Sequence, residues 1–234
     1  MSIADKTVLV TGAGRGIGQA LTDEALRRGA RRVYAAARRP SAHPDERVTP
    51  LRMDVTDAAQ VQSAAERVGS LDILVNNAGL ALFEGLGDRA TLERHLAVNL
   101  FGTYAVTEAF LPALTRSGGA IVNNLSLNSL APLPALAAYS VSKAAAFSLT
   151  QSLRTSLAGR GVRVHAVLTG PTDTDMVRDL DIPKASAESV ARAIFDAVDR
   201  GEEDIFPDPL AQSLADGWRN GAVKAFERQL AQIQ

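Results

Sequence analysis

The stretch Thr7-Val8-Leu9-Val10-Thr11-Gly12-Ala13-Gly14-Arg15-Gly16-Ile17-Gly18, near the amino terminus, decides how the rest of the chain is interpreted. Its first five residues are apolar or β-branched, which is typical of a buried strand. Four glycines follow at alternating positions, and a helical pattern then places Ile17, Leu21 and Ala25 on one face. The stretch therefore predicts a strand, a sharp turn and a helix in direct succession.

Outward from this stretch, short β-branched runs alternate with longer helical patterns. Strands that alternate with helices predict βαβ units with right-handed crossovers. We therefore expect one α/β domain with a doubly wound, mostly parallel, seven-stranded sheet and helices on both faces. The predicted strands are Thr7–Thr11, Arg32–Ala37, Val48–Met53, Asp72–Val75, Ala120–Leu125, Val162–Leu168 and Asp204–Phe206. The predicted helices are Ile17–Arg28, Ala58–Val68, Thr91–Leu114, Tyr139–Leu157 and Ala187–Asp199.

The composition excludes several classes of protein. The 234 residues are 46% hydrophobic and 22% charged, which suits one folded domain with a substantial core. The net charge of −1 provides no basic field for nucleic acid or an anionic membrane. The absence of cysteine excludes disulfides and thiolate catalysis, and the three histidines show no metal-ligand spacing, so we expect no metal site. Without a signal peptide or an apolar span, the expected location is cytoplasmic.

The glycine turn has the chemistry of an anion site. Glycines 12, 16 and 18 let the backbone turn sharply and approach a pyrophosphate, while the following helix directs its free N–H groups at that anion. The spacing Gly-x-x-x-Gly-x-Gly differs from the common Gly-x-Gly-x-x-Gly, and an ordinary tight turn is the alternative. Its position directly after a buried strand favours a dinucleotide site.

Two arginines indicate which dinucleotide binds. The second predicted strand ends in Ala35-Ala36-Ala37-Arg38-Arg39, where an NAD site usually carries an acidic residue for the ribose 2′-hydroxyl. Guanidinium groups suit a 2′-phosphate instead. The alternative is that both arginines are simply solvated, but a cationic pair with no acid favours NADP(H), with Arg15 inside the glycine turn as a further cation.

Tyr139-Ser140-Val141-Ser142-Lys143 places a phenol and an ammonium four residues apart, on one face of a helix. A tyrosine is a poor acid or base at neutral pH because its ordinary pKa is about 10. A nearby ammonium lowers that pKa, so Tyr139 is a candidate proton donor for a developing alkoxide. The alternative is an exposed helical turn with a surface lysine.

These features together resemble the short-chain dehydrogenase/reductase family. The resemblance covers about residues 5–175 and is carried by Thr11–Gly18, Asn76-Asn77-Ala78-Gly79, Asn99, Ser126, Tyr139 and Lys143. It implies a Rossmann fold and an NADP(H)-preferring carbonyl reductase or ketoreductase that acts on CH–OH and C=O groups. Homodimers or homotetramers are also implied, with Thr91–Leu114 and Tyr139–Leu157 forming a two-fold interface.

The resemblance implies a role for each catalytic residue. Ser126, thirteen residues before Tyr139, would polarise the substrate carbonyl, with Ser129 as a nearby alternative at the wrong spacing. Tyr139 would be the general acid/base, and Lys143 would bind the nicotinamide ribose and lower the tyrosine pKa. Asn99 would hold a water that links Lys143 to solvent.

The resemblance also implies the cofactor contacts. Asp54 and Val55 resemble the adenine contact, and the residues after the sixth strand resemble the nicotinamide contact. This chain has Thr169-Gly170 where the family usually has Pro-Gly, which leaves the stiffness of that loop open. The expected cofactor set is Gly12, Gly14, Arg15, Gly16, Ile17, Gly18, Arg38, Asp54, Val55, Asn77, Ala78, Gly79, Tyr139, Lys143, Gly170, Thr172 and Thr174.

The domain then divides into a glycine-rich cofactor half (5–118), a catalytic and substrate half (119–210) and a C-terminal helical tail (211–234) with the sole Trp218. The short, charged segment 175–186 is expected to be a lid over an open pocket for a small hydrophobic ketone, aldehyde or alcohol. Leucines 80, 82, 127, 130, 133 and 136 and Met176 are candidate walls. The alternatives are a catalytically silent nucleotide-sensing or scaffold protein and an epimerase or dehydratase on the same fold.

Overall fold

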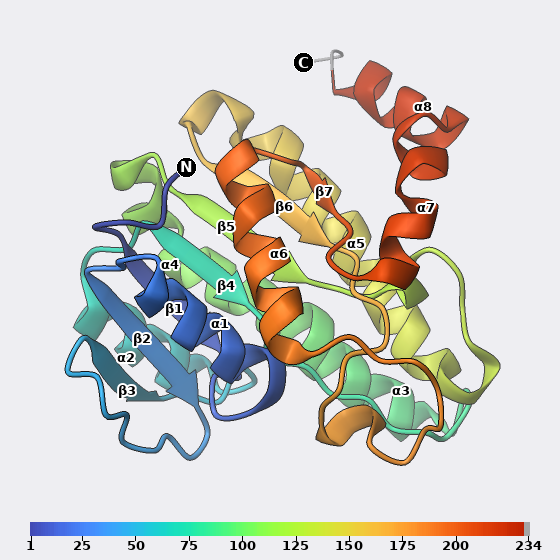
Figure 1. The fold of residues 1–234 in the computed structure, drawn as a ribbon, viewed down its shortest axis with the longest axis horizontal. Helices are drawn as coiled ribbons and strands as arrows, with labels where there is room; N and C mark the ends of the chain where they lie inside the picture. The colour runs from blue at the N-terminus through green and yellow to red at the C-terminus, as the bar shows by residue number, and fades with distance from the viewer. Residues whose placement is uncertain (232–234) are drawn as a thin grey trace.

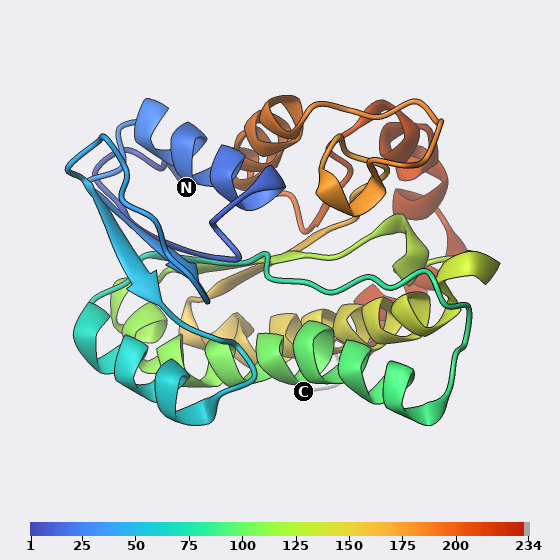
Figure 2. The ribbon, with the colours of Figure 1, turned by 90° about the horizontal axis from the view of Figure 1, so that it is seen from below.

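The computed structural model describes residues 1–231, and its seven strands form one parallel sheet with helices on both faces (Figures 1 and 2). The strand order is β3-β2-β1-β4-β5-β6-β7, and every neighbouring pair is parallel. The predicted doubly wound fold is thus confirmed. The strands are β1 (Thr7–Thr11), β2 (Arg32–Ala37), β3 (Val48–Arg52), β4 (Ile73–Asn76), β5 (Ala120–Asn124), β6 (Arg163–Val167) and β7 (Asp204–Ile205).

The helices cover the sheet in two layers. Figure 2 shows α1 and α6 on one face, with α2, α4 and α5 on the other. Long helices are α1 (Gly16–Arg27), α2 (Ala58–Val68), α3 (Arg89–Leu96), α4 (Thr103–Ser117), α5 (Ala137–Leu157), α6 (Ala187–Arg200), α7 (Pro209–Arg219) and α8 (Ala222–Leu230).

Each face of the sheet has its own hydrophobic core, because side chains alternate along a strand. In β1, Val8 and Val10 pack with Phe195 beneath α1 and α6, whereas Leu9 packs with Phe110 beneath α2 and α4. Burial on both faces explains why β1 is an uninterrupted apolar run.

One predicted element is wrong in detail. The single helix expected over Thr91–Leu114 is divided, since a π-helical turn at Ala97–Gly102 separates α3 from α4. The end of this turn packs closely on Val55, because a Cβ on Gly102 would lie 2.7 Å from Val55 Cγ2. Such turns insert an extra residue per turn and often occur at functional sites. This one carries Asn99.

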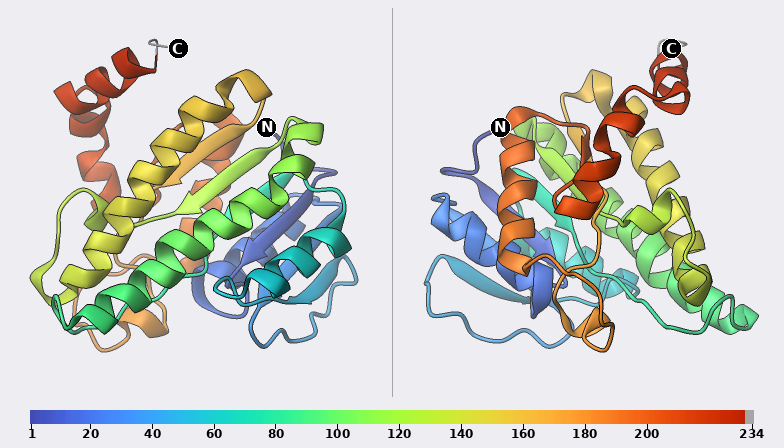
Figure 3. Two further views of the ribbon diagram at one scale, coloured as in Figure 1. Left: turned by 180° about the vertical axis from the view of Figure 1, so that it is seen from behind. Right: turned by 45° about the vertical axis from the view of Figure 1, so that its right-hand side comes forward.

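The C-terminal tail forms α7 and α8 beyond the β7 edge (Figure 3). The indole of Trp218 donates a hydrogen bond of 2.8 Å to Asp204 of β7, and its ring centre lies 5.5 Å from that of Phe147 with the two planes tilted by 57°. Lys224 of α8 is buried and also pairs with Asp204, at 2.8 Å. Trp218 and Lys224 therefore anchor the tail on the last strand.

The order of the strands places the functional crevice. The chain moves outward from β1 through β2 and β3, and then returns to β4 on the other side of β1. Ligands of open α/β sheets bind beyond the carboxyl ends of the strands at such a reversal. The glycine turn, which follows β1 directly, lies at this point.

Candidate active site

The shape of the glycine turn requires that its glycines carry no side chain. Gly12 and Gly16 have φ angles of +65° and +54°, which favour glycine. A Cβ on Gly18 would lie 2.1 Å from the carbonyl oxygen of Gly12, and one on Gly12 would lie 2.9 Å from Ala78 Cα. The turn is therefore folded tightly against the end of β4.

The start of α1 fits a pyrophosphate. The residue before the helix is Arg15, whose side chain does not cap the first turn, so the N–H groups there lack a side-chain acceptor. By contrast, Asp57 caps α2 by accepting two backbone hydrogen bonds. Free N–H groups and the helix dipole suit an anion. The glycine turn and Ile17 can therefore hold the phosphates of a dinucleotide.

The arginines around this turn differ in their partners. Arg38 and Arg39, beyond the end of β2, are exposed, and neither side chain forms an ion pair or hydrogen bond within residues 1–231. Gly14 lies beside the same strand end, since its Cβ would contact that of Ala37 at 3.7 Å. Arg15 instead pairs with Asp175 of the lid segment at 2.9 Å. Arg38 and Arg39 are thus the cations left available next to the turn.

The segment after β4 supports the turn from beneath. Thr11 Oγ1 accepts hydrogen bonds from the backbone N–H groups of Asn77 and Ala78, at 2.9 and 3.0 Å. The Asn77 amide donates to the carbonyls of Thr11 and Gly12, at 3.0 and 3.3 Å. The side chain of Asn77 therefore fixes the glycine turn in place.

The structure brings the predicted catalytic residues Ser126, Tyr139 and Lys143 together. Tyr139 and Lys143 share one face of α5, with the ammonium 5.7 Å from the centre of the phenol ring. The Tyr139 hydroxyl interacts with the side chain of Ser126, which follows β5. Ser129, the alternative serine, has a buried hydroxyl without a hydrogen-bond partner in the described part of the chain. The role of Ser126 in polarising a substrate carbonyl stays a prediction.

In this structure the pKa of Tyr139 moves in the direction opposite to the one expected from Lys143. Burial raises the pKa of Tyr139 to about 12, and the interaction with Ser126 opposes this rise. Burial also lowers the pKa of Lys143 to about 8. The Lys143 ammonium donates to the carbonyl oxygen of Asn124 at 2.8 Å. Desolvation of the charged form is therefore the main cause of both shifts.

Asn99 uses its amide within the protein. Its Oδ1 accepts from the backbone N–H of Leu80 at 2.8 Å, and its Nδ2 donates to Leu80 O at 2.9 Å and Ser142 Oγ at 2.8 Å. Ser142 donates in turn to the carbonyl of Tyr139 at 2.6 Å. Asn99 thus joins the segment that follows Gly79 to the first two turns of α5. Its role in holding a water for Lys143 stays a prediction.

The remaining cofactor residues lie around the crevice. Thr174 contacts the glycine turn, because its Cγ2 would lie 3.0 Å from a Cβ on Gly16. Thr172 pairs with Ala185 in a β-bridge that closes the base of the lid segment. Asp54 accepts hydrogen bonds from the backbone and hydroxyl of Thr56, at 3.0 and 2.8 Å, so this carboxylate also shapes a turn.

Sequence reasoning missed two residues in this site. His95 is buried, accepts from the Leu82 N–H at 3.1 Å, and lies edge-on to the Tyr139 ring at 6.3 Å. The side chain of Asn124, at the end of β5, bonds Asn77 after β4 and Thr169 after β6, and its carbonyl accepts from Lys143. The available signal for Asn124 was a polar side chain inside the apolar run Ala120–Leu125, two residues before Ser126.

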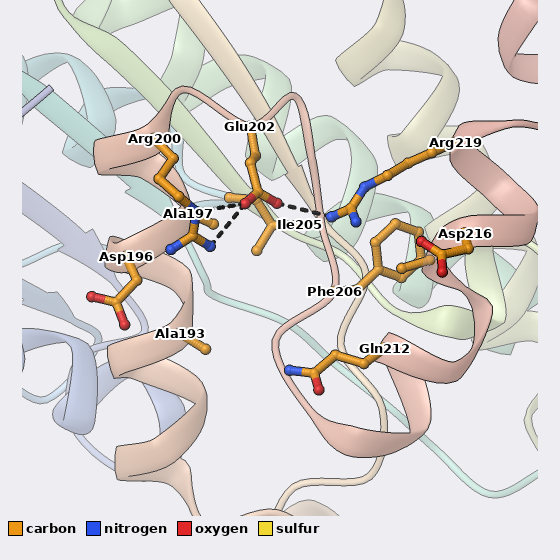
Figure 4. Close-up of a pocket in the computed structure, with 11 residues that line it drawn as sticks. Ala193, Asp196, Ala197, Arg200, Glu202, Ile205, Phe206, Gln212, Asp216 and Arg219 are labelled. Atoms are coloured by element: carbon orange, nitrogen blue, oxygen red, sulfur yellow. Dashed lines mark hydrogen bonds and ion pairs between the residues drawn. The ribbon is translucent and has the colours of Figure 1, made fainter.

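A separate groove of about 400 Å³ lies between α6 and α7 (Figure 4). Arg200 and Arg219 both point at Glu202 and pair with it at 2.8 and 2.9 Å. The predicted site residues are not part of its lining. This groove is therefore not the crevice defined by the glycine turn and Tyr139.

Comparison with known proteins defines the family. The family model described as short chain dehydrogenase matches residues 6–184. The chain belongs to this family. It is an oxidoreductase of the class that interconverts alcohols and carbonyls, and the predictions of family and enzyme class are confirmed.

Relatives of known name resemble the chain over most of its length. A 2-(S)-hydroxypropyl-CoM dehydrogenase of Xanthobacter autotrophicus is 36% identical over 82% of each chain. A sorbitol dehydrogenase of Cereibacter sphaeroides is 33% identical over 82% of this chain and 80% of its own. The crystal structure of a short chain dehydrogenase from Burkholderia cenocepacia in complex with NADP is 38% identical, with a TM-score of 0.88 over 97% of this chain and 99% of its own.

Within residues 1–231, none of the helices combines the length and the apolar character needed to cross a bilayer.

Proposed function

We propose that this chain is an NADP(H)-dependent reductase of small hydrophobic ketones or aldehydes, or the dehydrogenase of the corresponding alcohols. The proposal rests on one observation. Tyr139 and Lys143 share one face of α5, and Ser126 interacts with the Tyr139 hydroxyl, at the carboxyl end of the sheet where the glycine turn lies.

In this proposal, Ser126 and Tyr139 receive the carbonyl oxygen of the substrate. A bound nicotinamide supplies the hydride in the reductive direction and accepts it in the oxidative one. As negative charge develops on the carbonyl oxygen, the Tyr139 hydroxyl donates its proton to that oxygen. In the oxidative direction the Tyr139 phenolate accepts the proton of the alcohol. The raised pKa of Tyr139, about 12, keeps this hydroxyl protonated and suits donation in the reductive direction.

Arg38 supports NADP(H) over NAD(H), because its guanidinium has no ionic partner in the described chain and lies beyond the strand where the 2′-phosphate is expected. Arg39 is likewise exposed beyond the end of β2, and its side chain has no ionic partner in the described chain. The related structure from Burkholderia cenocepacia is itself an NADP complex, and it shares almost the whole length of this chain.

The pocket walls support a hydrophobic substrate. Leu133 and Met176 are exposed by 45% and 43%, and Met176 leaves apolar surface on the lid segment itself. Leu127 and Leu130 pack against the core beneath α7, and Leu136 is buried, so they shape the wall from behind.

We further propose that the enzyme is cytoplasmic and forms homodimers or homotetramers through α4 and α5. The π-helical turn, α4 and α5 carry exposed apolar side chains at Phe101, Tyr104 and Val141, with exposed fractions of 61%, 45% and 44%. A symmetric contact would cover them. Sedimentation equilibrium should give a multiple of 24.7 kDa, and a purely monomeric protein would contradict this proposal.

The activity is tested by following NADPH absorbance with a panel of ketones and aldehydes, and the oxidised cofactor with the alcohols. We expect turnover of at least one aliphatic or aromatic ketone, and a higher kcat/KM with NADPH than with NADH. A protein that binds NADPH but consumes it with none of the panel would instead be a silent member of the family.

A further inference from the structure

The corner between β6 and the lid segment, Thr169-Gly170, is held from two sides by side chains of other elements. Asn124, at the end of β5, lies on one side, and Asp208, just before α7, lies on the other. The carbonyl of Asn124 borders the site proposed above through Lys143, whereas Asp208 lies outside that site. The corner leads into Thr172 and Thr174, and Thr174 reaches the glycine turn at Gly16.

Asn124 connects this corner to the rest of the crevice. Its Oδ1 accepts from the Thr169 hydroxyl at 2.7 Å, and its Nδ2 donates to Asn77 Oδ1 at 2.9 Å. Asn77 in turn donates to the carbonyl of Gly12. One chain of hydrogen bonds therefore runs from the corner across two strand ends to the glycine turn.

Asp208 holds the other side of the corner. Its Oδ2 accepts from the backbone N–H of Gly170 at 2.7 Å, and its Oδ1 accepts from that of Ala211 at 3.0 Å, which caps α7. The residue is only 2% exposed, and no cation within residues 1–231 pairs with it. A buried carboxylate is costly unless it is hydrogen-bonded, so its two backbone partners fix its position.

Contact with Asp208 also restricts residue 170 to glycine. A Cβ there would lie 2.5 Å from Asp208 Oδ1. The carboxylate therefore packs directly over the backbone of the corner, and any movement of the corner breaks this contact or pulls on α7. The hydrogen bonds restrict the corner where a loop without proline would otherwise be free to move.

We propose that Asn124 and Asp208 are positioning residues that hold the Thr169-Gly170 corner for the nicotinamide end of the cofactor. The inference rests on the proposed function, since it assumes that a dinucleotide lies along the strand ends. Neither residue takes part in the chemical step. Both act through the backbone of the corner, whereas the adenosine end of the cofactor lies near Arg38 and does not depend on them.

The test compares a whole dinucleotide with its adenosine half. Thr169→Val removes the hydroxyl that bonds Asn124, and Asp208→Ser keeps a cap for α7 but is too short to reach Gly170. Calorimetric Kd values are measured for NADP⁺ and for 2′,5′-ADP, which lacks the nicotinamide. We expect each variant to weaken NADP⁺ about fivefold, as loss of one hydrogen bond does, with 2′,5′-ADP unchanged within about twofold.

Two matched variants separate positioning from stability. Thr150→Val removes an equally buried hydroxyl, the one that accepts from Asn123 at 2.9 Å, and Asp57→Ser changes the cap of α2. Both controls should lower the melting temperature without altering the ratio of the two Kd values. Equal losses for both ligands in Thr169→Val, or unchanged NADP⁺ binding in both corner variants, would overturn the inference.

Cofactor binding by the wild-type chain distinguishes a failure of this inference from a failure of the proposed function. If wild type binds neither 2′,5′-ADP nor NADP⁺ more tightly than NAD⁺, the cofactor proposal fails. If wild type binds both and the corner variants do as well, only the positioning inference fails. Should Asp208→Ser not fold, Thr169→Val alone still decides the matter.

Discussion

The two ends of the crevice are built by different means. At the glycine turn, the shape comes from missing side chains, since a Cβ on Gly12 or Gly18 would overlap backbone atoms. Around Tyr139, the shape comes from hydrogen bonds between segments far apart in sequence, such as Asn99 with Leu80 and Lys143 with Asn124. A contiguous backbone motif forms the first end, whereas the second is assembled only when the whole sheet forms.

The ends also differ in electrostatic cost. The arginines beside the glycine turn are exposed, so their charges stay solvated. Tyr139 and Lys143 are buried, and burial moves the pKa of the phenol to about 12 and that of the ammonium to about 8. The solvated arginines at the binding end therefore cost little free energy of folding. The buried Tyr139 and Lys143 at the catalytic end reduce the stability of the fold.

The largest expected effect lies at the catalytic end. Tyr139→Phe removes the proton donor and should lower kcat by about 10³-fold, while the Kd for NADPH stays near the wild-type value. Tyr104→Phe is the matched control, because within residues 1–231 that exposed hydroxyl bonds Glu108 alone. Steady-state kinetics and fluorescence titration measure the two quantities. A variant that keeps more than a tenth of the wild-type kcat would remove Tyr139 from the mechanism.

A backbone substitution should disrupt the other end nearly as strongly. Gly18→Ala places a Cβ 2.1 Å from the Gly12 oxygen, so the turn must open, at a cost of about 3 kcal/mol in the free energy of unfolding. Cofactor binding should be lost with it. Gly217→Ala, in a helix with open space around it, is the control and should be neutral or stabilising. Urea denaturation and NADPH titration check both, and normal binding by Gly18→Ala would contradict the account of the turn.

A charge reversal sharpens the cofactor assignment. Arg38→Asp removes the phosphate partner and adds a repelling carboxylate, so the Kd for NADPH should rise about 100-fold while that for NADH changes little. Arg32→Asp makes the same charge change at the opposite end of β2 and should leave the ratio of the two Kd values unaltered. An equal loss of both cofactors in Arg38→Asp would indicate damage to the fold instead of a lost phosphate contact.

The smallest effect concerns the cost of burying Lys143. Unfolded, this lysine keeps its proton to about pH 10.5, but in the folded chain its pKa is about 8. Between these values the folded state binds fewer protons, so wild-type stability rises with pH there. Lys143→Met should therefore raise the free energy of unfolding by about 1.5 kcal/mol at pH 7, and the gain should shrink towards pH 10. Chemical denaturation at both pH values measures this, and a gain independent of pH would exclude the burial cost as its cause.

Much of the fold followed from local patterns. The ranges of β1, β2 and α2 agree with the prediction, because each is a complete apolar or amphipathic run. The break between α3 and α4 was missed, since the π-helical turn at Ala97–Gly102 has no separate signal in an already helical pattern. It arises from tertiary contacts, including the packing of Gly102 on Val55.

The sequence by itself determined the doubly wound sheet, the glycine turn and the pairing of Tyr139 with Lys143 on one helical face, since each depends on spacing within a few residues. Only the tertiary structure decided that burial raises the pKa of Tyr139, that Lys143 bonds the carbonyl of Asn124, and that Asp208 packs over Gly170. Desolvation and long-range hydrogen bonds depend on which distant segments meet, and residue spacing along the chain carries no information about that.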